Sequence, residues 1–216
     1  GALKSTIRDF KNYLLMYLND GKTITTQKNE KAGRLISRHS LLEMERPRLY
    51  HQPGVYYGFG LFTRELHGKT IYYHDGSLPG VSSHFAFSKD MEMGVVVLCN
   101  TEDVPVNIIG EGLLSVLMGY DAKIPRVNHR LCYWDEKKCM EVCGSYETAE
   151  GSAFTLMLEG NSLTLKRDDN INKVFTISAN RLLNKGKYRD SFIDILRDED
   201  DQVIGAKFGS RCFRKH

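Results

Sequence analysis

The chain has 216 residues, of which 41% are hydrophobic and 26% are charged. This composition is ordinary for a globular protein and excludes a disordered, collagen-like or coiled-coil chain. The net charge is +3, and basic and acidic side chains are mixed evenly along residues 1–129 and 130–216. Sequence-independent binding of nucleic acid needs clustered cations, so we expect no such partner. No apolar run approaches the roughly 20 residues of a bilayer span, so we expect no membrane span either.

The cysteines argue against a disulfide framework and against a metal site. Their number is odd in a chain long enough to build a core, so reduced thiols are expected. Cys139 and Cys143 lie four residues apart, but no second pair of Cys or His completes a tetrahedral zinc set. We therefore expect no metal and no cofactor. The five cysteines are Cys99, Cys132, Cys139, Cys143 and Cys212.

The chain begins with a predicted helix followed by a long connection. Ser5 or Thr6 can cap the helix, and Gly21 can end it because glycine accepts the left-handed conformation. Residues 22–54 are polar and weakly periodic. We expect them to form a connection with a single helical turn at residues 40–45.

From Tyr57 onwards the hydrophobic pattern alternates with a period of two, which predicts an antiparallel meander. A turn is expected at residues 67–69 and a loop at residues 75–80. An apolar helix is predicted at residues 104–118. Residues 1–124 are therefore expected to form one α+β domain, ordered helix, sheet, helix. The strands of its sheet are predicted at residues 57–66, 70–74, 82–87 and 94–100.

After Ile124-Pro125 the pattern changes to short segments separated by turn residues. Seven or eight strands at a spacing of about 8–12 residues predict a small antiparallel barrel or sandwich. Closure is favoured because it leaves no unpaired edge. We assign residues 130–216 to a β-barrel domain of the lipocalin type. Its strands are predicted at residues 154–159, 162–167, 173–178, 181–185, 191–197, 203–208 and 211–214.

The most informative motif is His74-Asp75-Gly76-Ser77-Leu78-Pro79-Gly80. By itself it could be a hairpin whose glycines shape the turn. It follows Gly58-x-Gly60-Leu61, however, and precedes an apolar strand at residues 94–98 that leads to Asn100. This ordered series resembles the serine hydrolase family of penicillin-binding proteins, class C β-lactamases and related esterases and D-aminopeptidases. The resemblance covers about residues 1–120, where Gly1-Ala2-Leu3-Lys4-Ser5-Thr6 with Asp9 resembles the family's helix just upstream of the last sheet strands. Residues 130–216 resemble the β-rich module that some members append.

The resemblance implies a fold and a site. The expected fold is α+β, with part of a β-lactamase-like antiparallel sheet and its flanking helices. In this family the serine of a Ser-x-x-Lys motif attacks a carbonyl, and the His-x-Gly strand forms the opposite wall of the cleft. His74 would then face the substrate carboxylate or leaving group, and Gly76 would let the backbone approach the acyl group. The N–H of Ser77 would supply half of the oxyanion hole.

The nucleophile motif is absent from this chain. None of its 14 serines is followed three residues later by Lys, and no Gly-x-Ser-x-Gly elbow replaces it. Tyr17-Leu18-Asn19 matches the family's Tyr-x-Asn motif formally, but Tyr17 lies on the apolar face of its helix. We therefore expect the chain to be inactive alone. Three explanations stay open: a longer hydrolase with an N-terminal catalytic portion, a split enzyme, or a degenerate relative that only binds.

The partner expected for a complete enzyme is a small-molecule or peptide substrate, which could be a D-amino peptide, a β-lactam, an ester or an amide. The barrel could cover the cleft entrance or mediate homo-oligomerisation. The competing hypothesis is a binding or regulatory module that takes a partner protein or a small apolar ligand. The odd cysteine count favours the cytoplasm, whereas the family is often extracytoplasmic, so the compartment stays open. Aromatic side chains could line a lumen or fill a dry core: Phe154, Phe175, Tyr188, Phe192 and Phe208.

The remaining polar residues near the motif are weaker candidates. His84 lies in the next strand, where half of the side chains face away from any cleft. Asp75 alternates with His74 along its strand, which argues against a simple pair between these two. Three histidines in predicted loops or turns are expected to be solvated: His39, His51 and His67.

Overall fold

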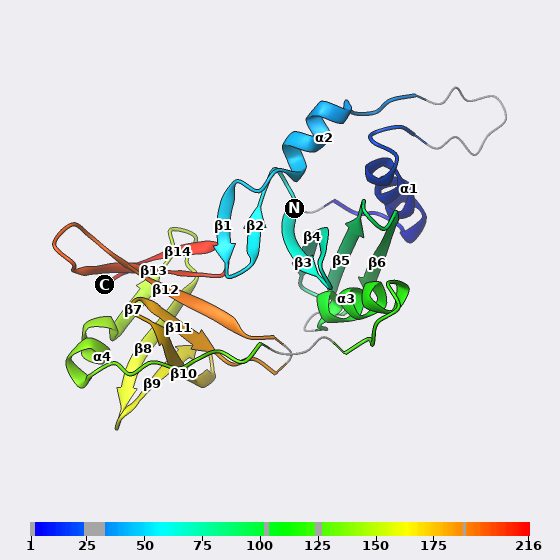
Figure 1. Cartoon of the computed structure of the whole chain (residues 1–216). Helices are drawn as coiled ribbons and strands as arrows, with labels where there is room; N and C mark the ends of the chain where they lie inside the picture. The colour runs from blue at the N-terminus through cyan, green and yellow to red at the C-terminus, as the bar shows by residue number, and fades with distance from the viewer. Residues whose placement is uncertain (1–2, 24–32, 102–103, 124–126, 188) are drawn as a thin grey trace. The chain divides into compact units, whose positions relative to one another are not determined.

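The computed structural model describes residues 3–23, 33–101, 104–123, 127–187 and 189–216. The chain divides into two compact units, residues 1–125 and 126–216 (Figure 1). The first unit has α+β composition with an antiparallel sheet, and the second is a closed eight-stranded β-barrel, as predicted at that level. The elements of the first unit are α1 (Ile7–Leu18), α2 (Arg38–Glu45), β1 (Leu49–Gln52), β2 (Val55–Tyr57), β3 (Phe62–Leu66), β4 (Lys69–Leu78), β5 (Val81–Ser88), β6 (Met93–Cys99) and α3 (Val106–Leu117).

Helix α1 begins and ends as the sequence predicts. The side chain of Thr6 accepts a hydrogen bond from the N–H of Asp9, which satisfies one of the free donors of the first turn. The chain leaves the helix through Gly21, whose φ is 84°. Tyr17 is 1% exposed and its ring stacks on Phe87 of β5, so its role is packing.

The sheet is a meander in which each strand pairs with the next along the chain, from β1 to β6. His67 and Gly68 join β3 to β4 and both have positive φ, 51° and 74°, as a type I′ turn requires. Pro79 and Gly80 join β4 to β5, with a φ of 80° at Gly80. Proline followed by a glycine of positive φ is the combination of a type II turn.

Three predictions about the first unit were wrong. The loop expected at residues 75–80 is mostly strand, because Pro79-Gly80 suffices to reverse the chain and β4 continues to Leu78. The strand expected at 57–66 is a hairpin of β2 and β3, since the N–H of Gly58 donates to the carbonyl of Leu61 and reverses the backbone. The connection expected at residues 22–54 contains α2, which is longer than one turn, and the edge strand β1.

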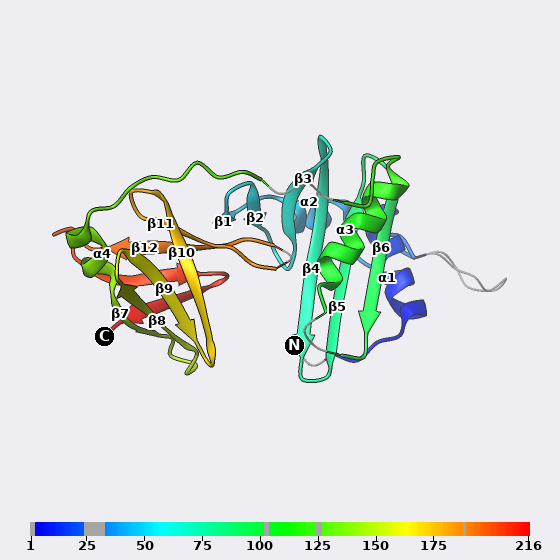
Figure 2. The same cartoon turned by 90° about the horizontal axis from the view of Figure 1, so that it is seen from below.

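The two faces of the sheet carry different helices. Phe85 and Phe87 of β5 pack against α1, whereas Ala86, which points the other way, packs in a cluster with Leu114 of α3. Figure 2 shows α3 and α1 on opposite sides of β5 and β6. Because side chains alternate along β4, Asp75 belongs to the α3 face together with Tyr73.

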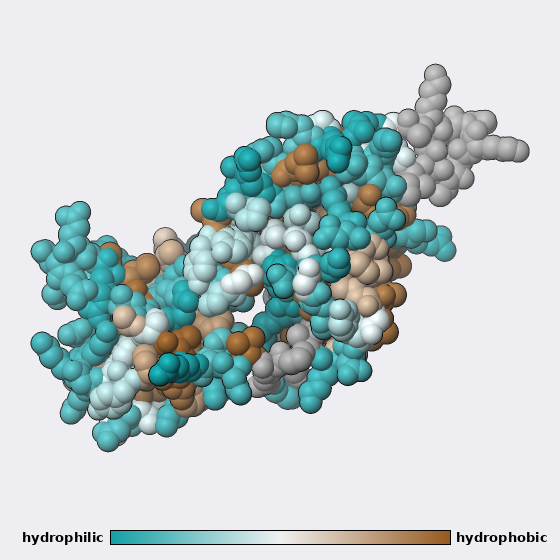
Figure 3. All heavy atoms as spheres, viewed as in Figure 1, coloured by the Kyte–Doolittle hydropathy of each residue, from teal (hydrophilic) through white to brown (hydrophobic). Residues whose placement is uncertain are grey.

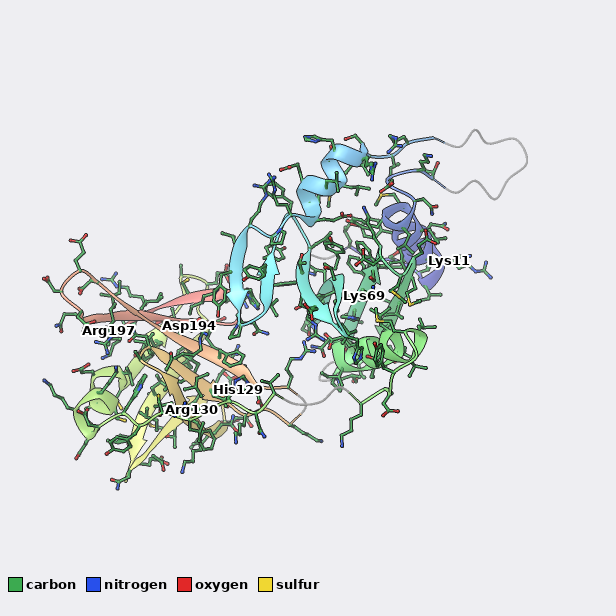
Figure 4. The ribbon with its side chains drawn as sticks, in the orientation of Figure 1. Lys11, Lys69, His129, Arg130, Asp194 and Arg197 are labelled. Carbon is green, nitrogen blue, oxygen red and sulfur yellow. The ribbon has the colours of Figure 1, made fainter. Side chains whose placement is uncertain are left out.

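In the second unit a closed barrel surrounds a packed core. Helix α4 is capped by Asp135, whose side chain accepts from the N–H of Lys138. The core includes Trp134 and Phe154, which are 6% and 3% exposed. Asp194 of β12, labelled in Figure 4, forms an ion pair with Arg181 on the neighbouring strand β11. The elements are α4 (Glu136–Val142), β7 (Gly144–Glu147), β8 (Ala153–Glu159), β9 (Ser162–Arg167), β10 (Asn170–Ser178), β11 (Arg181–Asn184), β12 (Ser191–Arg197), β13 (Val203–Phe208) and β14 (Arg211–Lys215).

The aromatic side chains considered for a lumen do not gather in one. Phe154 lies in the core and Phe208 packs against it. Phe175 follows the core residue Val174, and Phe192 precedes the core residue Ile193. Because side chains alternate along a strand, both phenylalanines point away from the core. Phe175 lies instead beneath the ammonium group of Lys185, 4.7 Å from its ring centroid. Tyr188 lies outside the described residues.

The helices of the described ranges include none that is long and apolar enough to cross a bilayer.

Glu45 gives a test of the packing between α2 and the sheet. Its carboxylate is 4% exposed and lies 2.7 Å from the ammonium group of Lys89, yet burial outweighs that ion pair and raises the pKa of Glu45. A raised pKa means that the folded state favours the neutral acid. The stabilisation is therefore present below the ordinary pKa and is lost as pH rises through the folded-state pKa.

We predict that the unfolding free energy of the wild type falls relative to that of Glu45→Gln as pH rises above about 4, the ordinary pKa of a glutamate. Urea unfolding of both proteins, followed by the NMR amide signals of β5, measures the difference. A difference that stays constant or grows with pH would contradict the prediction.

Candidate functional site

Within the part of the chain that the structure describes, the second half of β4 pairs with a strand on one side only. Strand β3 pairs with β4 from Lys69 to Tyr73, where Phe62 is the last partner. Beyond Tyr73, the described residues offer this edge no further strand, whereas β5 follows the other edge to Leu78. Residues 76–78 are exposed. The motif singled out in the sequence therefore lies on an open strand edge. Figure 4 labels Lys69, where β4 begins.

The turn after β4 sets the direction of its backbone groups. A two-residue loop is closed by a hydrogen-bonded pair, and such pairs alternate with non-hydrogen-bonded pairs along an antiparallel ladder. Leu78 and Val81 close the loop at Pro79-Gly80, so Ser77 and Ser82 form a non-hydrogen-bonded pair. The N–H and C=O of Ser77 therefore point away from β5, toward the open edge.

The turn before β4 gives the same direction independently. Leu66 and Lys69 close the loop at His67-Gly68, so the N–H of Lys69 points toward β3. Alternate residues of a strand point their backbone groups to the same edge. Asp75 and Ser77 are even numbers of residues from Lys69, so their N–H groups also point to the β3 side, where β3 has ended.

The His74 side chain lies at this open edge of β4. Its Nδ1 lies 2.7 Å from the carbonyl oxygen of Asp75 and donates to it. In the neutral ring Nε2 is then an acceptor, and it lies 3.5 Å from the hydroxyl oxygen of Tyr57. The ring centroid of Phe62 is 5.5 Å from that of His74 and 4.5 Å from that of Tyr57. The half-buried imidazole is thus held between an aromatic pair and the strand backbone.

Gly76 faces a neighbour inside the sheet. A Cβ at this position would lie 2.5 Å from the hydroxyl oxygen of Ser83, the residue opposite on β5. The Ser83 side chain therefore occupies the space that a side chain at residue 76 would need. This contact gives a structural reason for the glycine that requires no substrate.

Asp75 does pair with a histidine, but with His84 rather than His74. Its carboxylate oxygen Oδ1 lies 2.5 Å from Nδ1 of His84. His84 is 1% exposed on the α3 face, directly opposite Asp75 in the β4–β5 register. The sequence interpretation considered His84 only as a weak cleft residue and missed this pair. The register that follows from a two-residue turn at Pro79-Gly80 would have shown it.

The other histidines lie away from this edge. His67 was expected to be solvated, but its Nε2 lies 2.9 Å from the hydroxyl of buried Ser115 and its ring stacks on Tyr120 at 3.9 Å. His67 is therefore not solvated, because the type I′ turn places it over the end of α3. His39 is exposed on α2, as expected of a solvated residue, whereas His51 is half-buried against Phe62.

Tyr17, the tyrosine of the formal Tyr-x-Asn match, is unsuited to act as a base. Burial, first of all, and its hydrogen bond with Tyr13 raise its pKa far above the ordinary value. The two hydroxyl oxygens are 2.8 Å apart. The phenol therefore stays protonated, which agrees with the packing role predicted from the sequence.

The described residues contain no group of three or more His, Cys, Asp or Glu placed to hold a metal ion. Cys139 and Cys143 lie together at α4, where the thiol of Cys143 donates to the carbonyl of Cys139 at 3.2 Å. Burial raises the pKa of both thiols, which keeps them protonated and poorly nucleophilic.

Known proteins match this chain in fold rather than in sequence. No protein-family model and no curated protein matches it. A crystal structure of SurE with D-Leu has a TM-score of 0.62 at 14% identity, covering 84% of this chain and 44% of that one. Another crystal structure of SurE has a TM-score of 0.60 at 17% identity, covering 84% and 43%. This chain shares its fold with the matched part of SurE.

A weaker match is the octameric penicillin-binding protein homologue from Pyrococcus abyssi, with a TM-score of 0.49 at 18% identity. It covers 97% of this chain and 46% of the other. The chain thus spans less than half the length of each of these solved structures.

The contact at Gly76 makes a double-mutant test possible. We predict that Ser83→Ala stabilises the Gly76→Ala variant but not the wild type, because only the variant has a Cβ against the Ser83 hydroxyl. The coupling free energy should be about 0.5–3 kcal/mol, as for residues in contact. Urea unfolding of the four proteins measures it, and additive effects would show that Ser83 does not restrict residue 76.

Proposed function

We propose that this chain supplies one wall of the cleft of a serine hydrolase resembling penicillin-binding proteins. The nucleophile would come from a portion outside these 216 residues, in a longer chain or in a separate polypeptide. The reaction would be acyl transfer on a peptide, amide, ester or lactam. The chain alone would be inactive, since the Ser-x-x-Lys motif is absent.

The open edge of β4 is the observation that carries this proposal. An oxyanion hole needs backbone donors held rigidly toward the place where negative charge develops. The outward N–H of Ser77 meets that need, and the strand that holds it pairs with β5 from Tyr72 to Leu78. His74 lies at the same edge, with Nε2 as the acceptor of its neutral ring. These two groups match the roles that the family resemblance implies for His74 and Ser77.

A second observation supports a covering portion. Helix α3 buries one side against the sheet, but its other side is also apolar and is exposed. A helix that is apolar all round is normally buried. Figure 3 shows apolar atoms over the part of the first unit that carries α3. The exposed apolar side chains of α3 are Ile109, Leu113, Val116 and Leu117, each 44–54% exposed.

The substrate class is proposed more narrowly as peptides or amides with a D-configured residue. One of the SurE structures that share this fold was solved with D-Leu. A D-amino peptide is also among the substrates expected from the sequence resemblance. The competing module that binds an apolar ligand inside the barrel is less favoured, because Phe154 and its neighbours pack the barrel core.

The test compares two substitutions at Ser77 in the complete protein, expressed with the reading frame that precedes or adjoins residue 1. Ser77→Pro removes the backbone N–H, and proline is tolerated on a strand edge whose N–H faces solvent. Ser77→Ala keeps the N–H and removes only the hydroxyl. We predict that Ser77→Pro lowers the rate of D-aminoacyl amide hydrolysis by about 10²–10³, whereas Ser77→Ala stays near the wild type.

Labelling with a fluorophosphonate locates the serine in the same preparations. The proposal predicts a labelled Ser-x-x-Lys serine outside residues 1–216. Equal rates of hydrolysis by Ser77→Pro and Ser77→Ala would contradict the role of the Ser77 N–H as an oxyanion-hole donor. Absence of any Ser-x-x-Lys in the adjoining frames would favour the binding module instead.

A further inference from the structure

Asp75 joins a buried histidine to the histidine of the open edge. Its carboxylate accepts from Nδ1 of His84 at 2.5 Å, and its carbonyl oxygen accepts from Nδ1 of His74 at 2.7 Å. The first contact lies on the α3 face of the sheet and the second at the edge of β4. One residue therefore connects the core of the first unit to its open edge.

His84 is a firm anchor because its ring is enclosed. A Cβ on Gly110 of α3 would lie 2.2 Å from Cδ2 of His84, so the ring fits only against a glycine. The Nε2 atom is buried and has no hydrogen-bond partner among the described residues. A proton on Nε2 would leave a buried donor unpaired, which is costly. The geometry therefore places the proton of the neutral ring on Nδ1, where Asp75 accepts it.

The exposed half of β4 has few other fixed contacts. Strand β3 has ended, residues 76–78 are exposed, and Gly76 has no side chain to pack. We propose that Asp75 and His84 are positioning residues that hold this half of β4 against β5. They would keep the Asp75 carbonyl beneath His74 and the N–H of Ser77 at the open edge. The catalytic roles of His74 and Ser77 rest on the proposed function. The positioning of this half of β4 by Asp75 and His84 does not.

Four substitutions separate the hydrogen bond from other effects. Asp75→Ala removes the acceptor, whereas Asp75→Asn keeps an amide oxygen that can accept from His84. His84→Asn places an amide N–H near the position of Nδ1 and keeps the donor. His84→Gln places its amide near the position of Nε2 and loses that donor. Each disruptive change thus has a conservative partner at the same residue.

The readout is amide hydrogen exchange measured by NMR on the full chain. Gly76 and Leu78 point their N–H groups toward β5, so their protection reports how well this half of β4 is held. Tyr72, which also pairs with β5 but lies in the half of β4 flanked by β3, is the internal control. We expect Asp75→Ala and His84→Gln to speed exchange at Gly76 and Leu78 by at least about tenfold, with Tyr72 little changed. Asp75→Asn and His84→Asn should remain within a few fold of the wild type.

Nitrogen NMR of the His74 ring gives a second signature that general destabilisation would not change. The wild type should show the proton on Nδ1, and the two disruptive variants should show a mixture of tautomers. Unchanged exchange and unchanged His74 signals in Asp75→Ala would overturn the proposal. Equal changes at Tyr72, Gly76 and Leu78, or equal changes in His84→Gln and His84→Asn, would also overturn it. Neither readout needs a substrate or a nucleophile, so failure of the hydrolase proposal would leave these results standing.

Discussion

The register between β4 and β5 is the constraint on which the site depends. Because only Pro79 and Gly80 lie between the two strands, every residue of β4 from Tyr72 to Leu78 has a defined partner on β5. The same register places Ser77 in a non-hydrogen-bonded pair and sets Asp75 opposite His84. A shift by one residue would turn the Ser77 N–H inward and move the Asp75 side chain to the other face of the sheet. The outward N–H of Ser77 and the buried pair of Asp75 and His84 therefore both follow from the two-residue turn at Pro79-Gly80.

The two halves of β4 differ in how they are paired and buried. From Lys69 to Tyr73, β4 pairs with β3, and at Tyr72 and Tyr73 it also pairs with β5. The Ile71 and Tyr73 side chains are buried in the α3-face cluster. Beyond Tyr73, β5 is the one strand of the described residues that pairs with β4, so the N–H of Ser77 points to an open edge. An exposed donor on a rigid strand requires little reorganisation when charge develops beside it, which is the property that an oxyanion site needs. The edge of β4 is open beyond Tyr73 because β3 begins only at Phe62, the partner of Tyr73. Packing on the α3 face stabilises the strand.

The sequence predicts the elements better than their connections. Hydrophobic periodicity is strong in α1, in β5 and in the barrel strands from β8 to β14, and these elements were predicted. The short strand β7 was not among the predicted ranges. The motif at residues 74–80 contains Gly76, Ser77 and Pro79, which are typical of loops, and so its strand character was missed. Tertiary pairing with β5 overrides that local preference. The pair of Asp75 and His84 was missed for the same reason, because a six-residue loop leaves the register undefined.

Cross-strand NOEs in this chain test the register most directly. Opposite residues of a non-hydrogen-bonded pair approach most closely at their α-carbons, so their Hα protons give strong NOEs. Our account predicts Hα–Hα NOEs between Ser77 and Ser82 and between Asp75 and His84, with none between the Hα protons of Gly76 and Ser83. Strong NOEs for the pair of Gly76 and Ser83, or a register shifted by one residue, would contradict it.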